Sequence, residues 1–241
     1  MTLAGKTVLI TGAARRIGRS LALGVAAAGG DLVIHYGHSQ EEAESLEAEI
    51  RSFGRRACLI QADLSDANQV GSLIPRALEN GPLFAIVNNA SIFEPLDWDK
   101  TSLKDWNRNL MINLTAPFLL SQAFARNLPD NANGRIVNIL DWRAERPGDD
   151  HLPYTISKAG LAALTRSLAQ AFAPKITVNG LALGAILPPS HGQLDEKIIK
   201  YVPAQRWAEL EEVNQALLFL LDGPTYVTGE IIHLDGGRHL V

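Results

Sequence analysis

The feature that most constrains this chain is a regular alternation of short apolar segments with longer segments of helical periodicity. Apolar runs of the length typical of buried strands occur at residues 6–10, 31–36, 56–62, 83–87, 135–140, 176–179 and 230–234. When a helix follows each strand, successive strands lie parallel and the helices cover both faces of the sheet. We therefore expect a doubly wound α/β fold with a parallel sheet of about seven strands.

The segments between the expected strands carry helix signals. Helical spacing is found over residues 17–28, from about 102 to 127, from 158 onward and around 209–221. Ser39 and Glu42 have the spacing of a capping box, so we expect them to begin a helix that runs to about Gly54. Another helix is expected to start at Ser65. No linker, repeat or low-complexity stretch separates these elements, which predicts a single domain over residues 1–241.

Composition excludes several classes of function. The net charge is -4, without the basic surplus of a nucleic-acid-binding protein, so we expect no nucleic-acid partner. Apolar stretches fall short of the roughly 20 residues that span a bilayer, and the first residues lack a signal-peptide pattern, so we expect no membrane association. Cys58 is the only cysteine, which suits a reducing cytoplasm. The histidines lack metal-ligand spacing, so we expect no metal.

Glycines and polar residues recur where the expected strands end. The ligands of such sheets bind beyond the carboxyl ends of the strands. The Gly12 loop, Asp63, the sequence Asn88-Asn89-Ala90, Asp141 and the loop after Asn179 all fall at those ends. This convergence predicts a nucleotide cofactor site along that edge of the sheet.

The loop from Gly12 to Gly18 has the position of a phosphate-binding turn, after a strand and before a helix. Its glycines would let the backbone approach a pyrophosphate, which then lies at the amino terminus of the helix. Arg16 occupies the place of the middle glycine of the usual Gly-x3-Gly-x-Gly pattern, and Arg15 and Arg16 add positive charge. The alternatives are a tight turn without a ligand and two solvated arginines.

The end of the second expected strand indicates which nicotinamide cofactor is used. An acidic residue there would bind the ribose 2′-hydroxyl and reject a 2′-phosphate. The segment from His35 to Ser39 contains no acid, and Arg15, His38 and Ser39 could together receive the phosphate. The sequence therefore predicts NADP(H) in preference to NAD. The alternative for His38 is an exposed loop histidine without a ligand.

Tyr154 and Lys158 are four residues apart, so they share one face of an expected helix. An ammonium group near a phenol favours the phenolate, which lowers the pKa of the tyrosine from its usual value of about 10. A tyrosine tuned in this way passes protons near neutral pH. By itself the pair is more typical of a helix surface, so its meaning depends on the surrounding motifs.

Taken in order, the motifs resemble those of the short-chain dehydrogenase/reductase family from one end of the chain to the other. They are Thr11-Gly12…Gly18, Asp63-Leu64, Asn88-Asn89-Ala90, Asn113, Tyr154-x-x-x-Lys158, Val178-Asn179 and Thr228-Gly229…Asp235-Gly236-Gly237. The resemblance implies a single-domain, Rossmann-like doubly wound sheet with strand order 3-2-1-4-5-6-7. It also implies a cofactor site made by Gly12, Arg15, Arg16, Ile17, Gly18, His38, Ser39, Asp63, Leu64, Asn89, Ala90, Ser91, Tyr154, Lys158, Gly184 and Ile186.

The same resemblance implies a homotetramer, or otherwise a dimer, formed through the helices that carry Asn113 and Tyr154. Alanines on the second of these helices would permit close contact between subunits: Ala159, Ala162, Ala163 and Ala169.

Within that family, the details resemble the pteridine reductases and the bacterial dihydromonapterin reductases. The matching features are Arg16, the pair His35-Tyr36 with Ser39, and the sequences at 89–93 and 234–240. The most specific feature is Asp141, which stands where most of the wider family has a catalytic serine. The pteridine reductases also have aspartate at this position.

An aspartate at position 141 suits a pterin better than a ketone. An ionised carboxylate has no proton to donate, would repel negative charge growing on a ketone oxygen, and would oppose the phenolate form of Tyr154. A dihydropterin instead offers an imine nitrogen to protonate and N–H donors that a carboxylate accepts. The alternative is a site that has lost its activity through substitution. The retention of Tyr154, Lys158 and Asn113 argues against that alternative.

The resemblance implies a role for each site residue. Asp141 and Tyr154 would supply the proton, Lys158 would hold the cofactor ribose and tune Tyr154, and Asn113 would hold a water on the proton path. The substrate would be bound by Arg16, Ser91, Phe93, Asp141 and Tyr154, with the Phe93 ring stacked on the pterin. The alternative for Phe93 is a packing aromatic.

We therefore expect an NADPH-dependent reductase of a dihydropterin, of the dihydrobiopterin, dihydromonapterin or dihydrofolate type. The alternatives are a reductase of a ketone, quinone or 3-oxoacyl substrate and a regulatory protein that binds NADP without turnover. Residues 183–205 are expected to form a short substrate loop, in which Leu183 replaces the proline common in the family. No role follows from the sequence for Trp142, Arg143 and Arg146.

Overall fold

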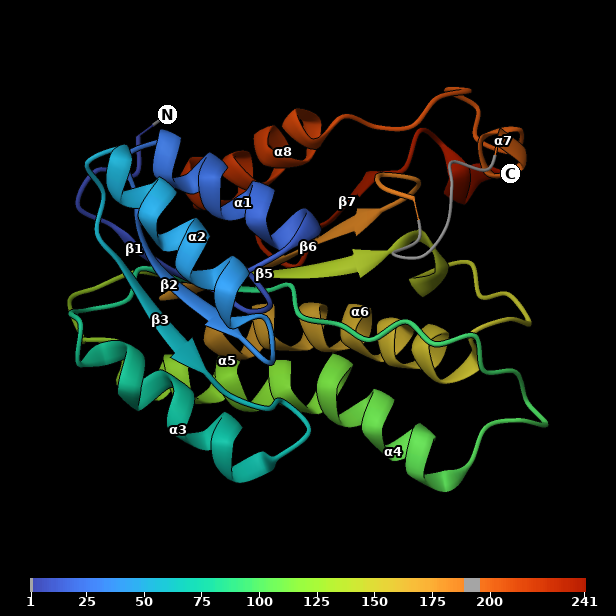
Figure 1. Cartoon of the computed structure of the whole chain (residues 1–241), viewed down its shortest axis with the longest axis horizontal. Helices are drawn as coiled ribbons and strands as arrows, with labels where there is room; N and C mark the ends of the chain where they lie inside the picture. The colour runs from blue at the N-terminus through green and yellow to red at the C-terminus, as the bar shows by residue number, and fades with distance from the viewer. Residues whose placement is uncertain (1, 189–195) are drawn as a thin grey trace.

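The computed structural model describes residues 2–188 and 196–241, which contain a seven-stranded sheet (Figure 1). All neighbouring strands are parallel, in the order β3-β2-β1-β4-β5-β6-β7, which confirms the predicted α/β fold and strand order. The strand order changes direction between β1 and β4, where doubly wound folds bind their ligands. The strands are β1 (Thr7–Ile10), β2 (Asp31–Tyr36), β3 (Ala57–Gln61), β4 (Ala85–Asn88), β5 (Gly134–Asp141), β6 (Ile176–Leu183) and β7 (Ile231–Leu234).

Consecutive buried residues explain why the central segments form strands. Every residue of β1, β4 and β6 is buried, as expected for strands covered by helices on both faces. β6 extends farther than predicted, because Leu183 is its last residue and pairs with Asp141 on one side and Leu234 on the other. A proline at this position would lack the N–H that a central strand donates. The leucine therefore belongs to the sheet and not to the expected loop.

Helices cover both faces of the sheet. Figure 1 shows α1, α2 and α8 on one face and α3, α4, α5 and α6 on the other. Each face buries its own apolar cluster, with Leu21 and Leu217 in one and Leu73 and Leu120 in the other. The helices are α1 (Arg16–Ala27), α2 (Gln40–Ser52), α3 (Ala67–Leu78), α4 (Leu103–Leu110), the π-helical turn η1 (Met111–Thr115), α5 (Ala116–Asn127), the 3-10 turn η2 (Trp142–Ala144), α6 (Leu152–Phe172), α7 (Glu196–Ile199), α8 (Leu210–Asp222) and the 3-10 turn η3 (Arg238–Leu240).

Helix α2 begins directly after Ser39, as predicted, but its capping and the start of α3 differ from the prediction. Ser39 precedes α2, but its side chain makes no capping hydrogen bond, so the expected capping box is absent. The start of α3 is capped by Asp66 and not by Ser65. A capping box that was not predicted occurs before α8, between Glu209 and Glu212. Spacing alone does not determine which hydroxyl or carboxylate turns back toward the helix.

The helix expected over residues 102–127 is continuous but contains the π-helical turn η1, with Asn113 at its centre. Pro117 explains the irregularity, because it has no N–H to donate to the Asn113 carbonyl in the α-helical register.

The alanines expected at a contact between subunits point in different directions. Ala162 and Ala169 are each 2% exposed and pack inside the subunit, so that expectation is wrong for both. Ala159 is half-buried and Ala163 is exposed, beside the exposed Ile156. Any contact through α6 therefore uses the side that carries Ile156.

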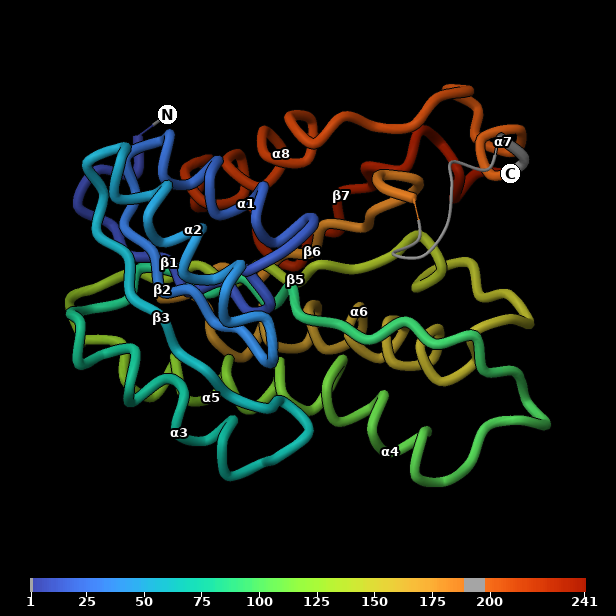
Figure 2. The backbone as a smooth tube through the Cα atoms, viewed as in Figure 1, coloured from blue at the N-terminus to red at the C-terminus, as the bar shows by residue number. Residues whose placement is uncertain are grey.

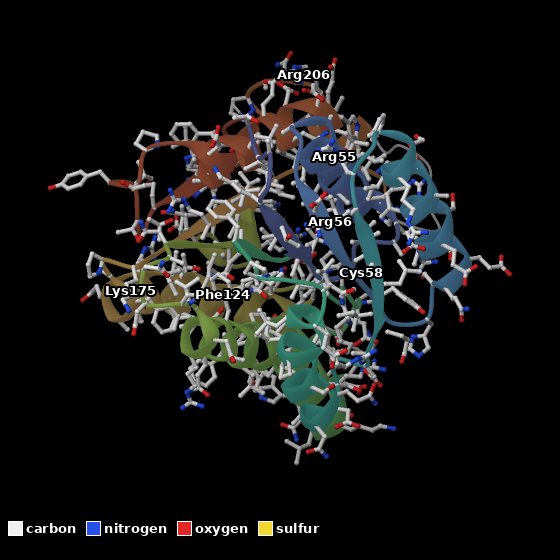
Figure 3. All side chains as sticks on the ribbon, turned by 90° about the vertical axis from the view of Figure 1, so that its left-hand side faces the viewer. Arg55, Arg56, Cys58, Phe124, Lys175 and Arg206 are labelled. Carbon is white, nitrogen blue, oxygen red and sulfur yellow. The ribbon has the colours of Figure 1, made fainter. Side chains whose placement is uncertain are left out.

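The two ends of the sheet differ. Figures 1 and 2 place α7 and the C-terminus beyond the carboxyl end of β5, near the loops where the sequence predicts the site. Figure 3 views the opposite end, with Arg56 on the side of β2 and β3. There Arg56, which directly precedes β3, pairs at 2.8 Å with Asp31, the first residue of β2. Of the helices in the two described ranges, none has the length and apolar character needed to cross a membrane.

Candidate active site

The glycine loop after β1 is shaped by contacts with the end of β4. Gly12 has a φ of 62°, and a Cβ added there would lie 3.0 Å from the Cα of Ala90. A Cβ on Gly18 would lie 2.7 Å from the Nδ2 atom of Asn89. That Nδ2 donates to the carbonyls of Thr11 and Gly12, at 2.8 Å and 3.1 Å. The side chain of Asn89 thus holds the loop, a role the sequence analysis missed, and its contact with a cofactor stays a prediction.

The amino terminus of α1 has the properties of an anion site. The side chain of Arg15, at the N-cap position, makes no hydrogen bond to the first turn, which contains Ile17 and Gly18. Arg16 has a φ of 54°, in the region that the missing glycine would favour. Its guanidinium donates to the carbonyl of Pro188 at 2.6 Å and links the loop to the segment after β6. Backbone N–H groups and positive charge therefore meet where a pyrophosphate would lie.

His35, which entered the sequence prediction only through the family resemblance, stabilises the same loop. Its ring is 2% exposed, Gly12 N donates to Nδ1 at 3.0 Å, and Nε2 lies 3.1 Å from the carbonyl of Ala62. These partners require a neutral ring with its hydrogen on Nε2. Burial lowers the pKa of His35 to about 4, in agreement with that state. The sequence signal that could have revealed this role was a histidine within a strand whose neighbouring residues, 32–34, are apolar.

The groups expected to receive a 2′-phosphate lie around the carboxyl end of β2. Arg15 is 3.6 Å from Glu42 in the first turn of α2, with 64% of its side chain exposed. His38 is exposed, and Ser39 does not use its hydroxyl to cap α2. The pKa of Asp63 is lowered mainly by hydrogen bonds from the turn that follows it, with a smaller effect from His38. The placement agrees with the expectation, and the contact itself stays a prediction.

Tyr154 and Asp141 are in direct contact. Tyr154 lies in the first turn of α6, and Asp141 is the last residue of β5. Tyr154 Oη donates to Asp141 Oδ2 at 3.0 Å, while Asp141 Oδ1 accepts from the backbone N–H of Arg143 at 2.9 Å. A phenol donor and a carboxylate acceptor therefore form one hydrogen-bonded pair at the carboxyl end of the sheet.

The protonation state of Tyr154 differs from the expectation for a Tyr-x-x-x-Lys pair. Burial, followed by the charge of Asp141, raises the pKa of Tyr154 well above its usual value of 10. Burial also raises the pKa of Asp141, against the opposing effects of Arg143, Tyr154 and Lys158. The predicted lowering of the Tyr154 pKa is therefore wrong for this site, because burial and the charge of Asp141 disfavour the phenolate. Tyr154 is a phenol at neutral pH and can act as a proton donor.

Lys158 lies on the same face of α6 as Tyr154, as expected. Its Nζ atom is 5.7 Å from the centroid of the Tyr154 ring and donates to the carbonyl of Ile139 at 2.7 Å. Burial lowers the pKa of Lys158 to about 8, so the ammonium form still predominates at neutral pH.

Asn113 is buried, and both polar atoms of its side-chain amide form hydrogen bonds within the protein. Its Oδ1 accepts from Ser91 Oγ at 3.1 Å and from Ile92 N at 2.9 Å. Its Nδ2 donates to the Ile92 carbonyl at 3.1 Å and to Ser157 Oγ at 3.0 Å. The side chain of Asn113 is therefore engaged within the chain, and its role on a proton path stays a prediction.

Phe93 lies against Tyr154, but His151 covers one of its faces. The rings of Phe93 and Tyr154 form a T-shaped pair at 4.7 Å, and the imidazole of His151 stacks on Phe93 at 3.9 Å with an interplanar angle of 6°. Half of the Phe93 surface is exposed. A pterin stacked on Phe93 must therefore use the other face or take the place of His151. Nothing in the sequence spacing indicated a role for His151.

Gly184 is required by a contact within the chain. A Cβ added there would lie 2.6 Å from the Cα of Asp235. The predicted cofactor residues Leu64 and Ile186 are buried, at 6% and 5% exposure. Residues 189–195 of the expected substrate loop lie outside the described residues. A cavity of about 290 Å³ is lined by residues such as Ala185, in the described part of this loop, and Asp235. Tyr154 is not among the residues that line it.

The residues that follow Asp141 have distinct environments. Trp142 is half-buried, with the guanidinium of Arg238 4.8 Å from its ring. Arg143 is 19% exposed at its side chain and contacts two carboxylates, whereas Arg146 is exposed. Within the described ranges, no three side chains of the metal-binding types gather into a group that could hold an ion.

Comparisons with known proteins identify the family. A family model described as enoyl-(acyl carrier protein) reductase matches residues 12–239. The 3-oxoacyl-[acyl-carrier-protein] reductase of Synechocystis sp. is 32% identical over 240 residues, which cover 98% of this chain and 97% of that protein. The chain belongs to the short-chain dehydrogenase/reductase family. It is therefore an oxidoreductase, as predicted.

Solved structures of other short-chain dehydrogenases/reductases superimpose closely on this one. FolM alternative dihydrofolate reductase 1 from Brucella canis, complexed with NADP, has a TM-score of 0.93 and 36% identity, covering 100% of this chain and 97% of that chain. A short chain dehydrogenase from Burkholderia cenocepacia, in complex with NADP, has a TM-score of 0.93 and 34% identity, covering 99% of each chain.

Several motif residues of this short-chain dehydrogenase/reductase stabilise the sheet. Asn179 donates to the Val227 carbonyl at 3.0 Å and accepts from Glu230 N at 3.0 Å, which fixes the approach of β7. Asn88 donates to Asn138 at 2.8 Å inside the core. These parts of the family resemblance therefore reflect folding requirements and carry no information on the substrate.

Proposed function

We propose that this protein is an NADPH-dependent reductase of a dihydropterin. The observation that carries the proposal is the hydrogen bond from Tyr154 Oη to Asp141 Oδ2 at 3.0 Å. It makes the second polar group of the site an acceptor, whereas a ketone reductase needs a second donor toward the substrate oxygen. The similarity to the Brucella canis protein named FolM alternative dihydrofolate reductase 1 adds support.

The residues present fit NADP(H) as the cofactor. The glycine loop and the uncapped amino terminus of α1 suit the pyrophosphate, and Arg15, His38 and Ser39 suit a 2′-phosphate. The ammonium of Lys158 would bind the ribose hydroxyls. Both solved structures described above carry NADP, in agreement with the predicted cofactor.

Bound NADPH would supply a hydride, with its two electrons, to the imine carbon of the pterin. Tyr154 would donate its proton to the imine nitrogen. Its raised pKa keeps the phenol protonated before this transfer. Asp141 would orient the phenol and return a proton to it from solvent, with Lys158 and a water held by Asn113 on the path. One proton is consumed for each NADPH oxidised.

The pterin itself would lie between the cofactor and the open face of Phe93, with Ser91 and Arg16 at its polar edge. A flat heterocycle on a phenyl ring buries apolar area while its edges stay available for hydrogen bonds. Phe93 and Ser91 are both exposed residues, as this requires.

The deciding assay follows NADPH oxidation by absorbance with dihydrobiopterin, dihydromonapterin and dihydrofolate, with NADH as the cofactor control. Turnover with at least one of these substrates and NADPH is expected. Tight NADPH binding without turnover on any of them would contradict the proposal.

A 3-oxoacyl substrate is the second candidate, because the Synechocystis relative of 32% identity is a 3-oxoacyl-[acyl-carrier-protein] reductase. The variant Asp141→Ser separates the two candidates. It restores a hydroxyl donor, so dihydropterin turnover is expected to fall roughly 10²-fold while reduction of a 3-oxoacyl thioester rises. A variant that keeps its dihydropterin turnover, or a wild type that already reduces the thioester faster, would favour the second candidate.

The assembly we propose is a cytoplasmic homotetramer, with a dimer as the alternative. Phe118 on α5 and Ile156 on α6 are 37% and 41% exposed, on the two helices expected at the interface. Light scattering is expected to give about four times the chain mass of 26.1 kDa, and Phe118→Glu combined with Ile156→Glu to lower that mass. The mass of a single chain for the wild type would contradict the assembly.

A further inference from the structure

The side chain of Arg143 lies between Asp141, which the proposed reaction uses, and Asp150, which it does not use. Its guanidinium lies 3.9 Å from Asp141 Oδ1 and donates to Asp150 Oδ2 at 3.1 Å. The same group lies 4.9 Å from the ring of Trp142 and 5.7 Å from the ring of Phe93. One side chain therefore contacts the proton-handling carboxylate and the aromatic wall.

The two oxygens of Asp141 are divided between these partners. Oδ2 accepts from Tyr154, and Oδ1 faces both the backbone N–H and the guanidinium of Arg143. The Asp141 side chain is only 18% exposed, so its charge is costly unless a cation lies close. Burial raises the pKa of Asp141, and Arg143 opposes that rise more than Lys158 does. Removing Arg143 would favour a protonated Asp141 and loosen the orientation of Tyr154.

A second connection runs from Arg143 to the stacked pair on the other side. Asp150 Oδ2, which accepts from Arg143, lies 3.1 Å from Nδ1 of His151, and the His151 ring stacks on Phe93. His151 has a φ of 51° immediately before α6, a conformation that needs support from its surroundings. Arg143 thus restrains both the phenol–carboxylate pair and the orientation of Phe93.

We propose that Arg143 is a positioning residue, which holds Asp141 as a carboxylate accepting from Tyr154 and fixes Phe93 through Asp150 and His151. The inference rests on the proposed role of Asp141 and Tyr154 in proton transfer. It assigns a function to a residue that no sequence motif marks. An exposed ion pair that only stabilises the fold would contribute little, since half of Asp150 is in solvent.

The test compares Arg143→Ala, Arg143→Lys and the control Arg146→Ala. Arg146 is an exposed arginine three residues later, for which the described part of the chain offers no ion pair. We expect Arg143→Ala to lower kcat about 10²-fold, the cost of misplacing a reacting group by about 1 Å, with the KM for NADPH unchanged. Arg143→Lys keeps the charge without the forked geometry and is expected to recover part of kcat. Arg146→Ala is expected to match the wild type.

A second measurement needs no substrate. Without the guanidinium, the pKa of Asp141 in the folded protein rises further above its value in the unfolded chain. The folded protein must then ionise a less favourably placed carboxyl group as the pH rises, and this lowers its stability. The Tm deficit of Arg143→Ala relative to the wild type is therefore expected to be larger at pH 8 than at pH 5. Arg146→Ala is expected to have the same small deficit at both values.

The two measurements separate failure of this inference from failure of the proposed function. If the wild type reduces a ketone and no dihydropterin, the proposed function fails, and kcat is measured on that ketone. A loss of kcat with a pH-dependent Tm deficit in Arg143→Ala still supports the inference. If Arg143→Ala behaves like Arg146→Ala in both measurements, or has a Tm deficit that does not change with pH, the inference is overturned.

Discussion

Replacement of Tyr154 by phenylalanine is expected to lower turnover about 10³-fold while NADPH binds as tightly as before. The phenyl ring keeps the T-shaped contact with Phe93 at 4.7 Å, so the change removes the proton donor and leaves the wall in place. The Asp141 oxygen that accepted from the phenol loses its partner. Initial rates with the best substrate, together with NADPH fluorescence titration, measure the two effects separately.

A matched control for this change is Tyr226→Phe. Tyr226 is 99% exposed, so loss of its hydroxyl is expected to leave turnover and cofactor affinity unchanged. If Tyr154→Phe retained a tenth or more of wild-type turnover, the phenol could not be the main proton donor. Asp141 in its protonated form would then be the group to test.

The second large effect is a loss of stability on acidification that originates at His35. The pKa of this histidine is about 4 in the folded protein, against 6.5 for an open histidine, because burial disfavours the charged ring. The unfolded chain therefore binds more protons than the folded chain between these values, and stability falls as the pH falls through that window. A shift of this size corresponds to roughly 3 kcal/mol in total, about 2 kcal/mol of which is lost by pH 5.

Urea unfolding at pH 7 and pH 5 measures this loss, and His35→Gln isolates it. Glutamine offers one acceptor and one donor in place of the contacts to Gly12 and Ala62, without a titrating group. The wild type is expected to lose about 2 kcal/mol more than His35→Gln between the two pH values. His38→Gln, at an exposed histidine in the loop that follows β2, is expected to behave like the wild type. Equal losses in the wild type and in His35→Gln would rule out His35 as the origin.

The fold was predictable because its signals are local. Each strand is a short apolar run and each helix has its own periodicity, so the alternation along the chain was enough to expect the parallel sheet. Errors occurred where a local pattern had more than one solution. Ser39 had capping-box spacing without capping, and Leu183 continued β6 where the family usually has proline.

The candidate site was predictable in its membership and much less in its chemistry. Helical spacing was enough to place Tyr154 and Lys158 on one face, and the ends of parallel strands brought Gly12 and Asp141 to one edge. The pKa of Tyr154 was predicted in the wrong direction, because burial and the charge of Asp141 raise it. Whether the charged form of a group is favoured depends on its surroundings and not on its spacing along the chain.

The sequence by itself determined the alternation of strands and helices, the glycine turn at the start of α1 and the presence of an aspartate where a hydroxyl is usual. These properties depend on residue type and spacing, which the chain carries wherever it folds. Only the tertiary structure decided that His35 is neutral beneath Gly12, that His151 covers one face of Phe93 and that Arg143 reaches both Asp141 and Asp150. Those contacts join different structural elements, and packing alone sets their distances, burial and charge states.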